Sequence, residues 1–92
     1  MNKTINQAVL EGILVKKPLK LGSRYSFSIM VKSEKSDLIN LFFDIETLDK
    51  RIFDFVNGLS VGTMIKCTCL LRNKILQNRL IPSLECYDIR TI

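Results

Sequence analysis

Positively charged side chains gather in two short segments of the sequence. Residues 16–24 contain four Lys or Arg and residues 72–79 contain three, and neither segment contains Asp or Glu. Unopposed Lys and Arg can bind phosphate groups through charge-assisted hydrogen bonds. Solvated loops without a ligand are the alternative interpretation, but the absence of carboxylates favours phosphate contact. The candidate phosphate-binding residues in these segments are Lys16, Lys17, Lys20, Arg24, Arg72, Lys74 and Arg79.

Few residues in this chain are suited to catalysis or to metal binding. There is no histidine, so Ser-His-Asp and Cys-His nucleophilic sites are excluded. No Gly-rich phosphate-binding loop with its lysine is present either. Cys67 and Cys69 resemble half of a zinc site, but Cys86 is the only other thiol, so zinc would lack a fourth ligand. We expect three buried structural thiols, no cofactor and no enzymatic activity.

Length and composition indicate a single folded domain covering residues 1–92. The hydrophobic content of 47% is typical of a globular protein. Fourteen basic residues against nine acidic ones give a net charge of +5, which favours anionic partners and nucleic acid first. No apolar run approaches the roughly 18 residues that a membrane-spanning helix needs. We therefore expect a cytoplasmic protein with no membrane partner.

Alternating apolar and polar side chains predict five strands, at residues 6–15, 25–32, 37–45, 63–72 and 80–89. Gly12 indicates a bend or a close backbone approach in the first strand, and Pro82 indicates a sheet edge in the last. Residues 16–24 and 72–79 are expected to be a loop and a hairpin connection. The expected inward residues are Tyr25, Phe27, Ile29, Val31, Ile39, Leu41, Phe43, Ile45, Ile65, Cys67, Cys69, Leu71, Leu84, Cys86 and Ile89. The expected outward residues include Lys32, Leu38, Phe42, Asp44 and Lys66.

One amphipathic helix is predicted at residues 46–57, between the third and fourth strands. Thr47 or Asp44 could cap its start, and Gly58 could end it in the left-handed conformation. Its expected buried positions are Leu48, Ile52, Phe55 and Val56, with Phe53 beside them. Three strands, a helix and two further strands are the layout of the five-stranded, all-β OB-fold barrel.

Three stretches of the chain resemble the bacterial single-stranded DNA-binding protein family. They are residues 6–18, residues 37–43 and residues 61–72, and the tail from residue 82 follows the closing strand of that family. In length the chain also resembles a short relative, the primosomal replication protein N, and a mobile-element paralogue is a further alternative. The chain departs from the family pattern at three positions, because Leu38 and Asp44 stand where base-stacking aromatics are usual and Cys69 replaces a glycine.

The basic segments and the resemblance together imply sequence-tolerant binding of single-stranded DNA, with RNA as an alternative ligand. Phosphate contacts would dominate, helped by Lys32 and Lys66 on the sheet, while Phe42 and Tyr25 are the candidates for base stacking. We also expect a homodimer or homotetramer and contacts with replication proteins. The alternative is an OB-fold protein-interaction module with little nucleic-acid affinity. Its apolar patch would comprise Met30, Leu38, Phe42 and Leu70.

Overall fold

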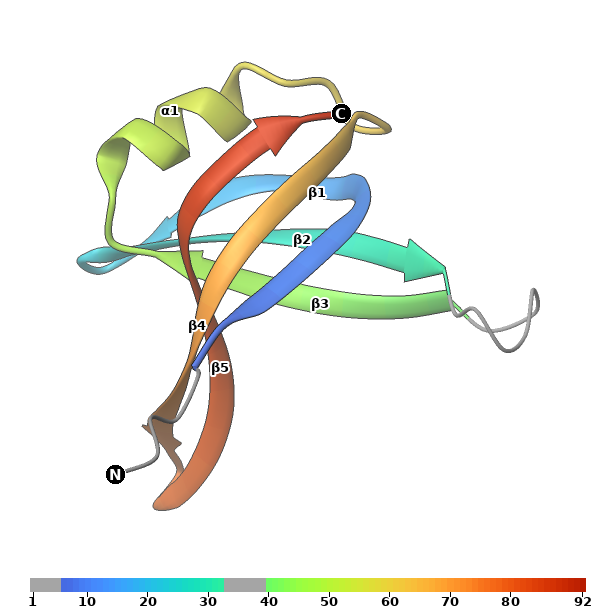
Figure 1. Cartoon of the computed structure of the whole chain (residues 1–92). Helices are drawn as coiled ribbons and strands as arrows, with labels where there is room; N and C mark the ends of the chain where they lie inside the picture. The colour runs from blue at the N-terminus through green and yellow to red at the C-terminus, as the bar shows by residue number, and fades with distance from the viewer. Residues whose placement is uncertain (1–5, 33–39) are drawn as a thin grey trace, which may run out of the picture.

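The computed structural model describes residues 6–32 and 40–92, and within them five strands and one helix form a closed barrel (Figure 1). Neighbouring strands pair in the order β1-β2-β3-β5-β4, with the helix between β3 and β4. The predicted five-stranded OB-fold barrel is thereby confirmed. The expected turn at 33–36 and the side chains of Leu38 and Ile39 lie outside the described residues. The elements are β1 (Ala8–Leu21), β2 (Arg24–Lys32), β3 (Asn40–Thr47), α1 (Lys50–Asn57), β4 (Met64–Leu76) and β5 (Arg79–Thr91).

The pairing of β1 with β4 closes the barrel, because these strands stand at the two ends of the strand order. Residues 8–13 of β1 pair with β4, and its residues 13–21 pair with β2. The change of partner occurs beside Gly12, where a Cβ atom would lie only 2.6 Å from the carbonyl oxygen of Met30. A side chain at this position would therefore clash with the backbone of β2. The predicted close backbone approach at Gly12 is confirmed.

The expected loop at residues 16–24 is mostly strand. β1 continues to Leu21, and only Gly22 and Ser23 form the turn to β2. Pro18 is buried within β1, at an irregularity of the β1–β2 register between Lys16 and Leu19. A register shift leaves a residue without a ladder partner, so a proline that cannot donate is tolerated there. Pro18 is therefore not a strand terminator in this barrel.

The expected connection at residues 72–79 is also strand. β4 runs to Leu76 and β5 begins at Arg79, so the turn consists of Gln77 and Asn78 alone. Both turn residues have positive φ, 51° and 63°, as a type I′ hairpin turn requires. We call residues 72–83 the arm. Figure 1 shows the arm extending away from the barrel, on the side opposite α1.

The edge predicted at Pro82 is confirmed. Pro82 pairs with Asn73 of β4, whereas the recorded pairing of β5 with β3 is confined to Leu84 and Glu85. Among residues 6–32 and 40–92, one side of β5 thus has no strand partner along the arm. The arm also explains why Leu71, predicted to point inward, is 52% exposed: it lies where the hairpin leaves the barrel. Leu41, near the open end of β3, is likewise exposed against expectation.

The core contains the three cysteines as buried free thiols, as predicted. The hydrogen bond with the Cys86 thiol, together with burial, raises the pKa of Cys67 and of Cys69. Both thiols therefore stay protonated at neutral pH and act as small apolar groups. The fully or nearly fully buried apolar residues are Leu14, Phe27, Ile29, Ile45, Ile52, Val56, Ile65, Cys67, Cys69 and Cys86.

The helix is shorter than expected and is capped differently. Its N-cap is Asp49, whose side chain accepts a hydrogen bond of 2.9 Å from the Arg51 N–H. Asp44 and Thr47, the predicted caps, belong to β3. Thr47 instead donates from its hydroxyl to the carbonyl of Cys86 at 3.0 Å. Gly58 ends the helix with φ −80°, so the predicted left-handed conformation is wrong.

Two of the predicted helix positions also differ from the structure. Leu48 precedes α1 and is 54% exposed, and Phe55 is 39% exposed. Ile52 and Val56 are buried as predicted. Within the described residues, no helix has the length and apolar character needed to cross a membrane.

Candidate nucleic-acid interface

The cross-strand register gathers polar and exposed side chains on the outer face of β1, β2 and β3. Ser28 of β2 lies opposite Asp44 of β3 and donates a hydrogen bond of 2.6 Å to its carboxylate. The neighbouring row places Met30 opposite Phe42. These side chains face away from the core because Phe27 and Ile29, which alternate with them, are buried. Lys16 lies in register with Ser28, and Lys32 lies in register with Asn40, so both predicted lysines are on this face.

The two candidate stacking residues have different surroundings. Phe42 is 67% exposed and lies at one end of a cleft described below. Tyr25 instead packs against Phe53 of α1, with ring centroids 4.4 Å apart. That contact occupies one face of the Tyr25 ring and ties it to the helix side of the barrel. Phe42 is therefore the better placed of the two to contact a base.

Arg24 and Lys74, which belong to different basic segments, meet at one carboxylate. Lys74 Nζ lies 3.1 Å from Glu46 Oε1, and Arg24 Nη1 lies 3.8 Å from Glu46 Oε2. The Glu46 side chain is only 11% exposed, whereas the two basic side chains are 41% and 43% exposed. The acid comes from β3, so counting charges within each basic segment could not reveal it. Sequence reasoning missed Glu46 for this reason.

Two other predicted cations also have carboxylate partners. Arg72 forms an ion pair with Glu85, which lies beside Glu46 where β3 and β5 run parallel. Lys66 lies 4.0 Å from Glu11 across the β1–β4 ladder. The expectation that the basic segments are unopposed is thus wrong for Arg24, Arg72 and Lys74. We call these three the cation cluster.

The remaining cations do not join that cluster. Lys17 donates from Nζ to the carbonyl oxygen of Asn57 at 3.1 Å, at the C-terminal end of α1. There its charge complements the helix dipole, because α1 has no basic residue in its own last turn. Lys20 is exposed opposite Tyr25, and Arg79 is exposed beside the turn of the arm. The predicted cations therefore divide between the outer sheet face, the helix side and the arm.

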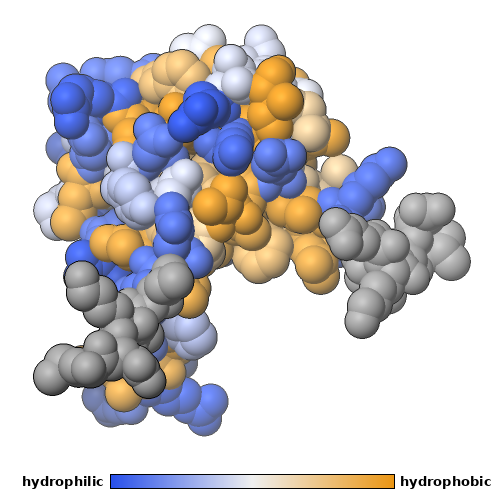
Figure 2. Space-filling view, viewed as in Figure 1, coloured by the Kyte–Doolittle hydropathy of each residue, from blue (hydrophilic) through white to orange (hydrophobic). Residues whose placement is uncertain are grey.

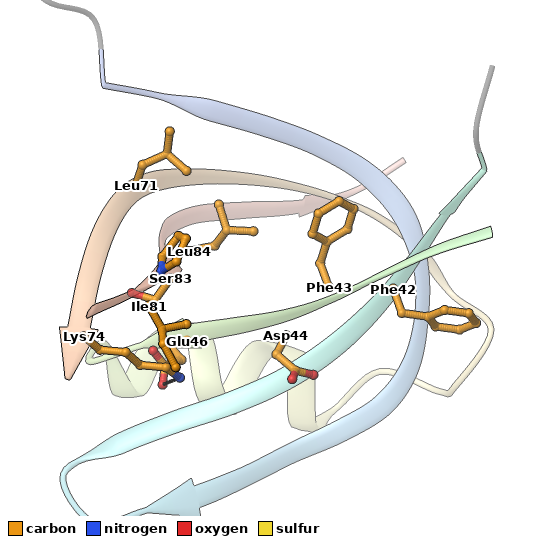
Figure 3. A pocket seen from close by; sticks show the side chains of 10 residues that line it. Phe42, Phe43, Asp44, Glu46, Leu71, Lys74, Ile81, Ser83 and Leu84 are labelled. Atoms are coloured by element: carbon orange, nitrogen blue, oxygen red, sulfur yellow. Dashed lines mark hydrogen bonds and ion pairs between the residues drawn. The ribbon is translucent and has the colours of Figure 1, made fainter. Parts of the chain in front are cut away.

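A cleft of about 420 Å³ lies between β3 and the arm (Figure 3). The cleft exists because β3 and β5 pair at Ile45 and Glu46 of β3 and then diverge. In Figure 3 the ring of Phe43 and the side chain of Leu84 point into it, and Lys74 lies against Glu46 at one end. Its lining residues are Phe42, Phe43, Asp44, Glu46, Leu71, Lys74, Ile81, Pro82, Ser83 and Leu84.

The cleft can accommodate a flat apolar ring with phosphates at its rim. Most of its lining residues are hydrophobic or aromatic, and Lys74 and Glu46 lie at one end, so the cleft combines apolar walls with a few polar groups as ligand-binding sites generally do. The cation cluster adjoins the same end through Glu46 and Glu85. Phe43 packs against the core as predicted and also lines this cleft, which the strand pattern alone could not indicate.

The barrel is similar to those of single-stranded DNA-binding proteins. The mitochondrial protein Rim1 of S. cerevisiae superposes with a TM-score of 0.81 at 14% identity, covering 97% of both chains. The Plasmodium falciparum protein, solved in complex with single-stranded DNA, gives a TM-score of 0.74 at 18% identity and covers 100% of this chain and 99% of its own. No protein-family model matches the sequence, and no curated protein matches it significantly. At these identities the likeness is one of fold.

Proposed function

We propose that this chain binds single-stranded DNA with little sequence preference, through its phosphates and a small number of bases. The observation that supports this most directly is the cleft between β3 and the arm, with Phe42 and Phe43 among its lining and the cation cluster beside it. Proteins that bind single strands combine a cationic track for the phosphates with aromatic side chains for the bases. The barrel that carries the cleft resembles one solved with single-stranded DNA.

In this proposal the two arginines of the cation cluster exchange a carboxylate for a phosphate, while Lys74 stays paired with Glu46. Arg72 leaves Glu85, and Arg24 turns away from Glu46, when the strand crosses the rim of the cleft. Because every exchange breaks an existing ion pair, the net gain per phosphate is smaller than for a free cation. We therefore expect modest affinity that falls as salt rises, since counterions are released on binding. Replication, recombination, repair or mobile-element replication would use such a binder, which needs no catalytic activity.

Fluorescence anisotropy with labelled oligothymidylate at several salt concentrations tests the proposal. The triple variant R72A/K74A/R79A should bind about tenfold more weakly at low salt and show a shallower salt slope. The matched control K17A/K50A/R90A removes the same charge outside the cleft and should change affinity less than about twofold. Affinity that does not change with salt, or equal loss in the two triple variants, would contradict the proposal. Duplex DNA and RNA of the same length are compared in the same assay.

A second candidate function, contact with another protein subunit, is favoured by a different groove. This groove, about 570 Å³ in volume, follows β1 and the end of β2. Figure 2 shows hydrophobic side chains in the middle of the face that it presents, where the first part of β1 lies toward the viewer. Met30, one of the predicted patch residues, lines the groove, whereas Phe42 and Leu70 do not. The groove is lined by Val9, Glu11, Gly12, Ile13, Met30, Val31, Lys32 and Met64.

We propose that this groove supports a homodimer or homotetramer, as the resemblance to bacterial single-stranded DNA-binding proteins and to primosomal replication protein N implies. A replication protein is the alternative occupant. Mass measurement by light scattering, with and without oligonucleotide, separates the two functions. A monomer at micromolar concentration that binds no oligonucleotide would leave the accessory-subunit function as the better description.

A further inference from the structure

Glu46 is an unexpected residue for a surface that binds a polyanion. It lines the cleft between β3 and the arm, and as an ionised carboxylate it can accept hydrogen bonds but cannot donate them. A phosphate at this position would be repelled. The residue is only 9% exposed, so water does not screen it as it would a surface glutamate. The chemistry of the cleft therefore requires a hydrogen-bond donor from the ligand at this end.

The hydrogen bonding of Glu46 is incomplete. Oε1 accepts a hydrogen bond of 3.1 Å from Lys74 Nζ. Oε2 is shielded from solvent and has no hydrogen-bond partner among the described residues, and Arg24 approaches it only to 3.8 Å. An unsatisfied buried acceptor is costly, because the groups around it do not replace the water it has lost. Oε2 thus has capacity for one further donor, and Oε1 retains a second lone pair.

Lys74 and Glu46 together present three adjacent hydrogen-bonding positions. The ammonium donates, and the two carboxylate oxygens accept, so the order along the ion pair is donor, acceptor, acceptor. The pairing edge of guanine has the complementary order, with the O6 acceptor followed by the N1–H and N2–H donors. Thymine matches only the first two positions, because its O2 would oppose the second carboxylate oxygen. Cytosine and adenine do not match the order.

We propose that the Lys74–Glu46 pair is a guanine-recognition site, an inference that rests on the proposed binding of single-stranded DNA. The guanine ring enters the cleft beside Phe43 and Leu84, and its pairing edge meets Lys74 and Glu46. Arg24, a half-exposed side chain without a hydrogen bond to Oε2, turns outward to a neighbouring phosphate and uncovers that oxygen. The chain then binds most sequences through phosphates and retains longest those that offer a guanine.

Competition binding with oligothymidylate of about 15 nucleotides carrying one substituted base tests this site. A single guanine avoids four-stranded guanine structures, and the thymidylate background lets the strand slide until the guanine reaches the cleft. We expect the strand with one dG to bind about five- to tenfold more tightly than all-dT, as one bidentate base contact provides. A single inosine, which lacks the N2 amino group, should lose most of that gain.

The variant Glu46→Gln replaces one acceptor by a donor at nearly constant size, and it should abolish the dG preference while all-dT is still bound. The matched control Glu11→Gln changes another ion-paired glutamate, 4.0 Å from Lys66 and outside this cleft, and should keep the preference. The inosine comparison uses the unaltered chain, so it tests recognition of the guanine N2 amino group even if Glu46→Gln fails to fold. Equal binding of dG, inosine and all-dT strands overturns the guanine site and leaves the proposed function standing. Absence of binding to every strand overturns both.

Discussion

The two basic hairpins of this chain are nearly alike in sequence character and differ in what their cations do. In the β1–β2 hairpin, Lys17 contacts the end of α1 and Lys20 lies opposite Tyr25, on the helix side of the barrel. Arg24, at the start of β2, instead approaches Glu46 beside the cleft. In the β4–β5 arm, Arg72 and Lys74 contact carboxylates beside the cleft. A cluster of positive charges in a sequence therefore does not by itself identify a binding surface. Which strand faces each cation decides its role.

The two hairpins should differ most in their contribution to stability. Leu14 of β1 is fully buried, whereas Leu80 of the arm is 71% exposed. We expect Leu14→Ala to lower the free energy of unfolding by about 2–5 kcal/mol, because it removes packed methyl groups and leaves a cavity. Leu80→Ala, the matched control, should change it by less than about 0.5 kcal/mol. Urea unfolding measures both. A comparable loss in Leu80→Ala would mean that the arm is packed against something else, such as a second subunit.

A smaller effect is expected from Lys17. Lys17→Ala removes the contact with the Asn57 carbonyl and the favourable charge at the end of α1, which should lower the free energy of unfolding by about 0.3–1 kcal/mol. Lys20→Ala removes an equal charge from the same hairpin without a helix contact and serves as the control. Oligothymidylate affinity should change by less than about twofold for Lys17→Ala. A tenfold loss of affinity would place Lys17 in the interface and remove the contrast between the hairpins.

The smallest expected effect concerns the pH dependence of the helix cap. Hydrogen bonds from the Arg51 side chain and backbone hold the pKa of Asp49 below its usual value. The folded state therefore favours the charged form, and its stabilisation is present above the ordinary pKa of Asp and lost as the pH falls through the lowered value. Asp49→Asn keeps a good N-cap but cannot titrate. Between about pH 6 and pH 2, the denaturant midpoint of Asp49→Asn should fall less steeply than that of the unaltered chain. Parallel plots of midpoint against pH for the two proteins would contradict this.

Strand alternation was sufficient to predict the barrel and much of its core. Phe27, Ile29 and the three cysteines are buried where period-two alternation puts them. The predictions of a loop at residues 16–24 and a connection at residues 72–79 were wrong, because they relied on neighbouring residues such as proline and on local charge. Pro18 sits at a register irregularity inside a strand, and the turn at Gln77 and Asn78 contains no glycine to mark it. The sequence therefore predicts irregular connections in both segments, where the structure has strands.

The cleft could not be predicted from the sequence because it depends on where two distant strands separate. Glu46 and Lys74 are 28 positions apart, and they meet because β5 pairs with β3 at Glu46 and with β4, which carries Lys74, along the arm. Alternation specifies which face of a strand is buried but not which other strand covers it. Phe43 is an example: alternation predicted its inward position, but not its place in the wall of the cleft.

Pro82 has a consequence for how molecules of this protein meet one another. In the part of the chain that the structure describes, β5 has an unpaired edge along the arm, and unpaired strand edges tend to pair between chains and cause aggregation. A proline offers no N–H to an incoming strand, so it interrupts the run of donors that such pairing needs. The edge of the arm can therefore stay accessible beside the cleft, because Pro82 disfavours the pairing of a strand from another molecule.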